Sequence, residues 1–136
     1  MKRNRLALAA TTGALALGAA LATSTGTASA ATPWQGCAVG NICVYSELNG
    51  YGSVCAWDGD DPDWQGGAVR CSWSSTKAVK SIWNRGTGGS GSYRHVKFYF
   101  GADYTNYYGC AAQGFKGNTG PDAGAKLRSH QWVTNC

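Results

Sequence analysis

The chain has 136 residues and a formal net charge of +5, but only 14% of its residues are charged and 20 are glycine. Three of its 12 basic side chains lie within the first five residues; without them, nine basic side chains face seven acidic ones, a net charge of +2. This near balance removes the main reason to expect a nucleic-acid partner.

The N-terminal 30 residues have the pattern of a secretory signal peptide. Three basic residues precede an apolar stretch over residues 6–21, and a segment of small residues ends at Ala30. This order predicts cleavage before Ala31. A membrane anchor is disfavoured because the apolar stretch is shorter than the ~20 residues that a spanning helix needs. We therefore expect a secreted, extracellular protein with a signal peptide over residues 1–30, one domain over residues 31–136 and no membrane contact after cleavage.

Six cysteines lie in the predicted mature part. An even count in a small exported chain indicates three disulfides, although six cysteines allow 15 pairings. We expect local pairing: Cys37–Cys43, Cys55–Cys71 and Cys110–Cys136. The last two bonds would close loops worth roughly 3–4 kcal/mol each. A zinc site is the alternative, but the chain has no C-x-x-C pair and export favours oxidation.

Short apolar runs alternate with turns along the mature part, which is typical of antiparallel β-structure. The predicted strands of the first half are residues 42–45, 54–57 and 78–83. A hairpin turn with Asn-Gly is predicted over residues 48–52, and a polar loop over 58–67. A Gly/Ser linker over residues 87–92 separates the halves.

The second half repeats the pattern after the linker. Its predicted strands are residues 95–100, 110–112 and 126–133. A turn rich in Tyr and Asn is predicted over residues 102–109, and a polar loop over 117–124.

The two halves therefore look like an internal repeat. Tyr51-Gly52 matches Tyr108-Gly109, and residues 79–81 match residues 127–129. Trp83 and Trp132 follow the second match, and we expect them to be buried at equivalent positions. Two such units would bury their apolar faces as stacked sheets. The predicted fold is all-β, with two Greek-key motifs packed as a small sandwich and stapled by disulfides.

Several motifs resemble the Streptomyces metalloproteinase inhibitor family. Residues 37–45, a short cysteine loop followed by a strand with Tyr45, resemble the family's opening. Residues 80–84 (KSIWN) are similar to its Ser-x-Trp-Asn strand, and residues 124–129 (GAKLRS) to a segment near its C-terminus. These motifs follow one another over most of residues 37–133. The resemblance implies a βγ-crystallin-like fold of two Greek keys and inhibition of secreted metallopeptidases.

The resemblance also implies a mode of inhibition. A stiff loop would occupy the peptidase cleft, because rigidity lowers the ordering cost of binding, and an extended loop can pair with an edge strand of the enzyme. In the family the reactive bond follows a cysteine of the second Greek key, and its nearest match here is Cys110–Ala111. The family's second cysteine is replaced by Phe115. The expected partner is a secreted metallopeptidase, bound by a monomeric inhibitor.

Two arrangements bear on calcium. A crystallin-type site is not expected, because Lys77 and Lys80 of the first unit, and Gly124 and Ala125 of the second, stand where oxygen ligands are needed. A separate acidic loop holds Asp58, Asp60, Asp61 and Asp63. It lacks EF-hand spacing and the closing Glu. We interpret it as a solvated loop, with a weak calcium site as the alternative, and expect neither metal nor cofactor.

Enzyme signatures are missing from the sequence. The mature part has His95, His130 and Glu47, but no H-E-x-x-H motif and no nucleophile elbow. Both histidines are expected at the surface or at strand edges. We therefore expect that the protein is not an enzyme.

The aromatic residues support an alternative function. Most of the six Trp and seven Tyr are expected to pack in the core and hairpins. The candidates for exposed binding aromatics are Trp64, Trp73, Tyr104, Tyr107 and Tyr108. Exposed rings can stack on a sugar or anchor an interface. The alternative is thus a non-inhibitory extracellular module, glycan-binding or toxin-like.

Overall fold

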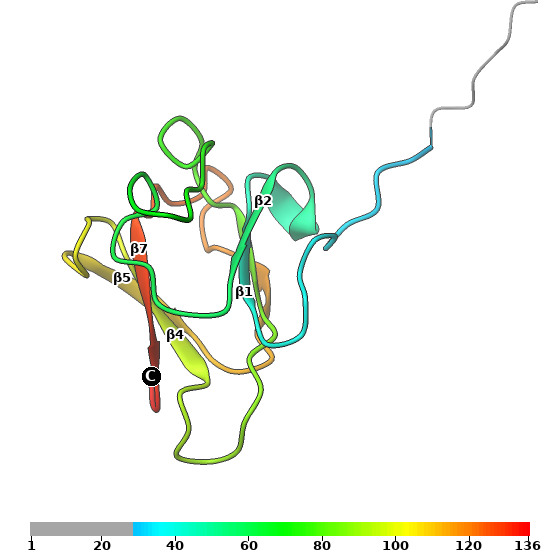
Figure 1. The fold of residues 1–136 in the computed structure, drawn as a ribbon. Helices are drawn as coiled ribbons and strands as arrows, with labels where there is room; N and C mark the ends of the chain where they lie inside the picture. The colour runs from blue at the N-terminus through cyan, green and yellow to red at the C-terminus, as the bar shows by residue number, and fades with distance from the viewer. Residues whose placement is uncertain (1–28) are drawn as a thin grey trace, which may run out of the picture.

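The computed structural model describes residues 29–136 (Figure 1). The predicted signal peptide lies almost wholly outside this part. The elements are β1 (Ile42–Tyr45), η1 (Leu48–Gly50), β2 (Val54–Trp57), β3 (Ser81–Asn84), β4 (His95–Tyr99), β5 (Tyr107–Ala111), β6 (Lys116–Asn118) and β7 (Ser129–Val133). Within the described residues, no helix has the length and apolar character to span a bilayer.

Two antiparallel sheets form the domain, one with the strand order β2-β1-β3-β6 and one with the order β5-β4-β7. We call them sheet A and sheet B. β6, from the second half, completes sheet A by pairing with β3. In return, Asp61 of the first half bridges His130 on β7 of sheet B. Each half thus lends its third segment to the other sheet, which confirms an all-β fold of two interlocked Greek keys.

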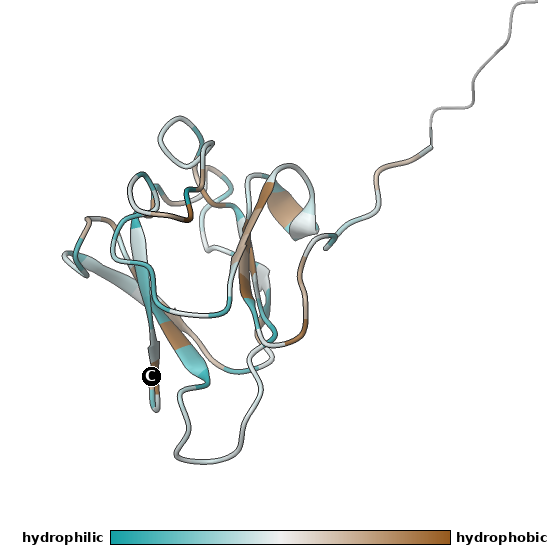
Figure 2. Ribbon diagram, viewed as in Figure 1, coloured by the Kyte–Doolittle hydropathy of each residue, from teal (hydrophilic) through white to brown (hydrophobic). Residues whose placement is uncertain are grey.

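The core lies between the two sheets. Along β4, Val96 and Phe98 are buried while His95, Lys97 and Tyr99 alternate with them and are half-buried. This period of two is what a strand with one face on a core requires. β1 is buried along its whole length, and Figure 2 shows the hydrophobic segments of β1 and β2 in brown.

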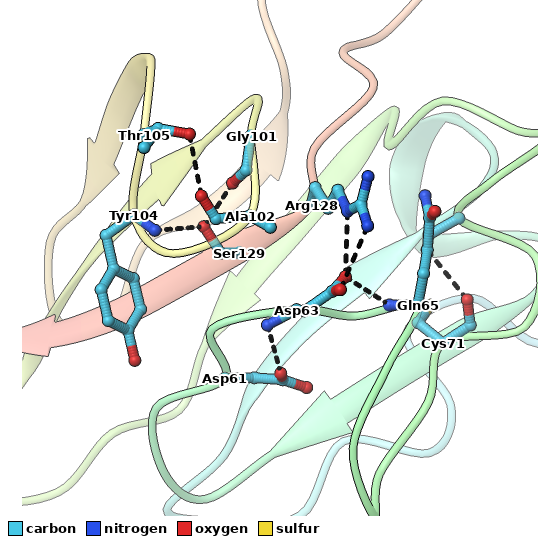
Figure 3. A network of polar contacts seen from close by, with 11 residues as sticks. Asp61, Asp63, Gln65, Cys71, Gly101, Ala102, Tyr104, Thr105, Arg128 and Ser129 are labelled. Carbon is cyan, nitrogen blue, oxygen red and sulfur yellow. Dashed lines mark hydrogen bonds and ion pairs between the residues drawn. The ribbon is translucent and has the colours of Figure 1, made fainter.

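Ser81 and Ser129 occupy equivalent places in the two Greek keys. Ser81 Oγ donates a 2.7 Å hydrogen bond to Glu47 O in the β1–β2 hairpin. Ser129 Oγ donates a 2.6 Å bond to Gly101 O in the β4–β5 hairpin (Figure 3). Each hydroxyl also accepts a backbone N–H from the same hairpin. The predicted repeat is therefore real, and these two serines define its register.

This register corrects two of the predicted matches. Trp83 follows Ser81 by two residues and Trp132 follows Ser129 by three, so the rings point to opposite faces of their strands. Trp132 is 8% exposed and lies in the core, whereas Trp83 is half-buried outside the core, with the Cys37–Cys43 cluster. The prediction that both are buried at equivalent positions was wrong.

The hairpin match was also wrong by three residues. The N–H groups that reach the two serines come from Gly50 and Tyr104, so Gly52 corresponds to Asn106 and not to Gly109. Gly52 and Asn106 both have positive φ, at 81° and 57°. Tyr51-Gly52 and Tyr108-Gly109 resemble each other in sequence, but the backbone conformation matches Gly52 to Asn106, three residues before Gly109.

Three disulfides have the local pairing expected, and no described cysteine is free. Cys37–Cys43 closes a loop before β1. Cys55–Cys71 joins β2 to the segment that follows it. Cys110–Cys136 joins β5 to the C-terminus. These bonds limit the unfolded chain and stiffen loops at both ends of the sandwich.

The acidic loop was predicted to be solvated, but it lies along the free edge of β7. The N–H of Asp61 donates to His130 O at 3.1 Å, and the N–H of His130 donates to Asp61 O at 3.0 Å. Asp60 Oδ1 accepts the N–H of Trp132 at 2.7 Å. The loop therefore serves as an edge segment of sheet B, and Asp61 is only 8% exposed.

Asp63 fastens the end of the same loop (Figure 3). Its two carboxylate oxygens accept hydrogen bonds from the Arg128 guanidinium at 2.9 and 3.1 Å. Hydrogen bonding to Arg128 lowers the pKa of Asp63, as does the N–H of Gln65. The loop carboxylates thus hold backbone and side chains of this domain, which local sequence does not reveal.

Trp64 was a candidate exposed aromatic and His130 was expected at the surface or at a strand edge, but both side chains are fully buried. Trp64 lies between the sheets, where its ring stacks on Trp57 with centroids 4.8 Å apart. His130 packs beside the same rings. The segment around Trp64 crosses to sheet B, and this crossing carries the indole into the core.

Candidate functional site

Three loops gather at one end of the sandwich, the lower end in Figure 1. They are the disulfide loop over residues 37–43, the β3–β4 loop over 85–94 and the β5–β6 loop over 112–115. Each presents one exposed apolar side chain: Val39 (65% exposed), Tyr93 (73%) and Phe115 (41%). We call these three loops the loop-end surface. Exposed apolar groups on loops set by a rigid scaffold are typical of binding surfaces.

Asn84, at the end of β3, holds two of these loops together. It is fully buried, and its Nδ2 donates 3.0 Å hydrogen bonds to Arg94 O and Ala111 O. Its Oδ1 accepts the N–H of Gly86 at 2.8 Å, and its own N–H donates to Phe115 O at 2.8 Å. One buried amide therefore positions the β3–β4 and β5–β6 loops relative to each other.

Gln113 adds a second set of bonds between the same loops. Its Nε2 donates to Gly86 O and Gly88 O, both at 3.0 Å. Its N–H donates to His95 Nδ1 at 3.1 Å. Within the loop, the N–H of Phe115 donates to Ala112 O at 2.9 Å and closes a tight turn. The backbone of Phe115 is thus held on both sides, and its ring lies over Gly117 of β6, beside a second cavity that Tyr108 and Thr119 also line.

Arg85 ties in the disulfide loop. The N–H of Gly40 donates to Arg85 O at 2.8 Å, and the N–H of Arg85 donates to Asn41 O at 2.8 Å. Its Nη1 donates to Cys37 O at 2.6 Å. Together with the Cys37–Cys43 bond, these contacts make the three loops one rigid unit, which can bind without a large loss of conformational entropy.

An aromatic and cationic layer flanks the loop-end surface. The guanidinium of Arg85 lies 4.5 Å from the ring centroid of Trp83, and Lys116 Nζ lies 4.0 Å from it. Trp34 packs edge-on against Trp83 and Tyr45. Burial raises the pKa of Tyr45 to about 12. The layer is held by cation–π contacts and supports Arg85 and Lys116 beside the loops.

A cavity of ≈ 530 Å³ opens beside the loop-end surface. Its lining includes Asp58 and Asp60 of the acidic loop, Tyr93 of the β3–β4 loop, and Gln131 and Trp132 of β7. The ion pairs of the described residues are Lys80–Glu47 and Arg128–Asp63. Neither carboxylate of the cavity is therefore neutralised by a cation in residues 29–136.

The proposed reactive bond, Cys110–Ala111, lies in β5 and not in a loop. Cys110 is half-buried and bonded to Cys136. Ala111 is 3% exposed and pairs with Val96 of β4. The structure therefore does not present this bond for entry into a cleft, because a paired strand with a buried side chain cannot insert. The exposed β5–β6 loop follows it directly.

The predicted exposed aromatics are not brought together. Trp64 is fully buried, a correction whose cause is its place between the sheets. Trp73 is half-buried and packs against the core, as does Tyr108. Trp64, Trp73 and Tyr108 are therefore poor platforms for a ligand.

A smaller aromatic cluster remains on sheet B. Tyr107 is 56% exposed, and its ring centroid lies 6.0 Å from that of Tyr99. Tyr104 is half-buried, and its ring centroid lies 5.8 Å from that of Tyr99. Burial raises the pKa of Tyr99 and of Tyr104. Tyr104 and Tyr107 are the part of the predicted aromatic surface that the structure retains, and Tyr99 lies beside both.

Sequence reasoning did not find the loop-end surface. Asn84 and Gln113 are polar residues whose partners lie on other loops, so local pattern gives no sign of them. The available signal was the apolar residue in each glycine-containing loop: Val39 before Gly40, Tyr93 after Gly91 and Phe115 after Gly114.

Among the described residues, no group of three or more His, Cys, Asp or Glu side chains is placed to hold a metal ion. The carboxylates of the acidic loop instead make the backbone and side-chain hydrogen bonds described above.

The architecture is that of a small disulfide-bonded β-sandwich that displays rigid loops at one end. The model of peptidase inhibitor family I36 matches residues 30–111, more than half of the chain, and the chain therefore belongs to that family. This confirms the resemblance to the Streptomyces metalloproteinase inhibitor family. Because the family consists of inhibitors, the protein is not an enzyme, as expected.

The solved structures that are similar to the chain include two βγ-crystallins. A βγ-crystallin from Ciona intestinalis has a TM-score of 0.49 and 16% identity, covering 69% of this chain and 100% of its own. Geodin, a βγ-crystallin from Geodia cydonium, has a TM-score of 0.46 and 16% identity, covering 69% of this chain and 49% of its own. No curated protein matches the chain.

Proposed function

We propose that this protein is a secreted inhibitor of metallopeptidases that blocks the active-site cleft with a rigid loop. The observation that carries the proposal is the loop-end surface, where exposed Val39, Tyr93 and Phe115 stand on loops joined by Asn84. Membership in a peptidase inhibitor family supports the class of partner. The metallopeptidase target rests on the motif resemblance of residues 37–45, 80–84 and 124–129.

The β5–β6 loop is the proposed inserting segment. Phe115 is apolar and 41% exposed, and its carbonyl oxygen is fixed by the N–H of Asn84. Such a loop pays little entropy on binding, and its ring suits an apolar subsite of a cleft. The carried-over bond Cys110–Ala111 immediately precedes this loop, so the proposal moves the contact by a few residues along the same segment.

The proposed compartment is extracellular, and the proposed state is a monomer. Three disulfides in a small domain suit an oxidising environment, where they persist. The signal-like residues 1–30 supply the route of export. N-terminal sequencing of protein recovered from the medium tests this part, with Ala31 as the expected first residue.

Titration of two peptidase classes tests the function. The full chain is expressed with export, and the protein recovered from the medium is titrated against a thermolysin-like metallopeptidase and a subtilisin-like serine peptidase. We expect saturable loss of the metallopeptidase activity at a stoichiometry near one. Full activity of both enzymes at micromolar inhibitor contradicts inhibition, and loss of the serine peptidase alone contradicts the metallopeptidase target.

Glycan binding is the second candidate, and Tyr99, Tyr104 and Tyr107 are the observation that favours it. Their rings offer an aromatic face on sheet B for a sugar ring. Retention of the protein on chitin or peptidoglycan, with loss of retention in Tyr107→Ala, would support it. Equal recovery of protein from glycan and from uncoated polystyrene beads would count against it.

A further inference from the structure

We propose that the cavity beside the loop-end surface takes a basic side chain, lysine or arginine, from the bound peptidase. This inference rests on the proposed function and names the chemistry of a second contact with the same partner. It concerns Asp58, Asp60, Gln131 and Trp132, which lie outside the loop-end surface, together with Tyr93, which belongs to it.

The charge of the cavity selects a cation. Asp58 is exposed and makes no hydrogen bond or ion pair among the described residues. Asp60 uses one oxygen, Oδ1, to accept the N–H of Trp132, which leaves Oδ2 for a ligand. No lysine, arginine or histidine lines the cavity. Two carboxylates without a counter-ion favour the binding of an ammonium or guanidinium group.

The walls of the cavity suit both the aliphatic part and the charged end of a lysine or arginine side chain. The rings of Trp132 and Tyr93 line it, and aromatic faces attract a cation placed over them. Trp132 is 8% exposed, and its Nε1–H has no hydrogen-bond partner. That nitrogen is itself buried, and the six-membered ring of Trp132, which lies against Gly86 of the lining, is the part that borders the cavity.

Position makes the cavity part of the same interface. Gly40, beside the exposed Val39, belongs to its lining, and so do Gly86 and Tyr93 of the β3–β4 loop. A protein that covers the loop-end surface therefore also covers the mouth of the cavity. Its ≈ 530 Å³ volume is within the range of ligand sites.

A titration with a minimal probe tests the cavity itself. Exported, folded protein is labelled with ¹⁵N, and N-acetyl-arginine amide is added while the indole N–H resonance of Trp132 is followed. The matched probe is N-acetyl-citrulline amide, which keeps the shape and lacks the charge. We expect saturable shifts with the arginine probe, at least about tenfold weaker binding of the citrulline probe, and weaker binding at high salt.

Two variants locate the site. Asp58→Asn removes one unpaired carboxylate and should weaken the binding of the arginine probe about tenfold. Asp122 is an exposed aspartate of the segment before β7 and does not line the cavity. Asp122→Asn should therefore leave the affinity for the arginine probe unchanged. Equal binding of the two probes, or equal binding by Asp58→Asn and the parent protein, overturns the proposal. Matching thermal midpoints of both variants show that the fold is intact.

The peptidase assay separates this proposal from the proposed function. If the protein inhibits a metallopeptidase and Asp58→Asn inhibits as strongly as the parent, the cavity proposal fails and the proposed function stands. If no peptidase is inhibited while the arginine probe binds as expected, the proposed function fails and the cation site stands. An inhibition constant raised about tenfold in Asp58→Asn alone supports both.

Discussion

The indole Nε1 of Trp64 donates a 2.8 Å hydrogen bond to Nδ1 of His130 in the core. Nε2 of the same imidazole lies 2.8 Å from Gly59 O. Since Nδ1 accepts, Nε2 carries the proton and donates to Gly59. His130 is therefore a neutral imidazole that joins β7 to the acidic loop along its edge. Trp64, from a polar segment, and His130, from β7, are thus buried together as one hydrogen-bonded pair.

This pair predicts acid sensitivity. Burial lowers the pKa of His130 to about 4 from its ordinary value of 6.5. As the pH falls below 6.5, the unfolded chain binds a proton that the folded one does not. The free energy of unfolding therefore decreases between pH 6.5 and about 4, by up to about 3 kcal/mol. Below pH 4 the loss from His130 levels off.

Asp63 adds to the loss at lower pH, because Arg128 lowers its folded pKa and its stabilising charge disappears as the carboxylate is protonated. Denaturant unfolding at pH 7.5, 6.5, 5.5 and 4.5 measures the effect. In His130→Gln the slope between pH 6.5 and 4.5 should nearly vanish. A parent protein with the same free energy of unfolding at pH 7.5 and 4.5 would contradict the role of His130.

Phe115→Ala tests the inserting loop. We expect inhibition of the metallopeptidase to weaken at least about tenfold, because one exposed aromatic anchor can carry much of the binding energy. The thermal midpoint should change little, since the side chain is 41% exposed. Tyr51→Ala is the matched control: Tyr51 is 40% exposed and lies in the β1–β2 hairpin at the opposite end. Equal inhibition by the two variants would exclude the β5–β6 loop.

Asn84→Ala should destabilise the domain and disorganise the loops. It removes three side-chain hydrogen bonds and leaves buried carbonyls of Arg94 and Ala111 unpaired. The expected loss is about 3 kcal/mol in the free energy of unfolding. Gln113→Ala removes bonds at the loop periphery and should cost about 1 kcal/mol. Denaturant unfolding measures the two losses of unfolding free energy. A larger loss in Gln113→Ala than in Asn84→Ala would refute Asn84 as the main link between the loops.

Ser81→Ala and Ser129→Ala should have similar effects. Each hydroxyl is fully buried and makes two hydrogen bonds to the hairpin of its own Greek key. Each substitution leaves a carbonyl and an N–H of the hairpin, both at least partly buried in the bonds they lose, without this partner, which costs about 1–3 kcal/mol. Thermal and denaturant unfolding measure both losses. If one variant were neutral and the other severely destabilised, the two serines would not be equivalent.

Much of the fold was predictable because it is local. Short runs of strand-favouring residues at 42–45 and 54–57, and the alternation in residues 95–100, predicted β1, β2 and β4 with nearly their observed bounds. Short spacing between cysteines favoured the pairing that the structure has. β6 was missed because Lys116–Asn118 contains no apolar residue, and its strand conformation comes from pairing with β3 in the other half.

The remaining errors come from long-range contacts. Trp64 lies in a segment of polar residues, and only its crossing to sheet B carries it into the core. Trp83 and Trp132 differ by one residue in their distance from Ser81 and Ser129, which reverses the face of a strand. The loop-end surface depends on Asn84, whose partners are up to 31 residues away along the chain. Such contacts leave no periodic signal in the sequence.

The central claim is that the loop-end surface contacts the peptidase. Amide hydrogen exchange of the inhibitor, alone and in complex with an active-site-intact thermolysin-like metallopeptidase, measures this directly. Slower exchange should be confined to residues 38–41, 85–94 and 112–115 and the adjoining cavity. Slower exchange confined instead to the outer face of sheet B around Tyr99 and Tyr107, or exchange unchanged throughout at saturating peptidase, would contradict the account.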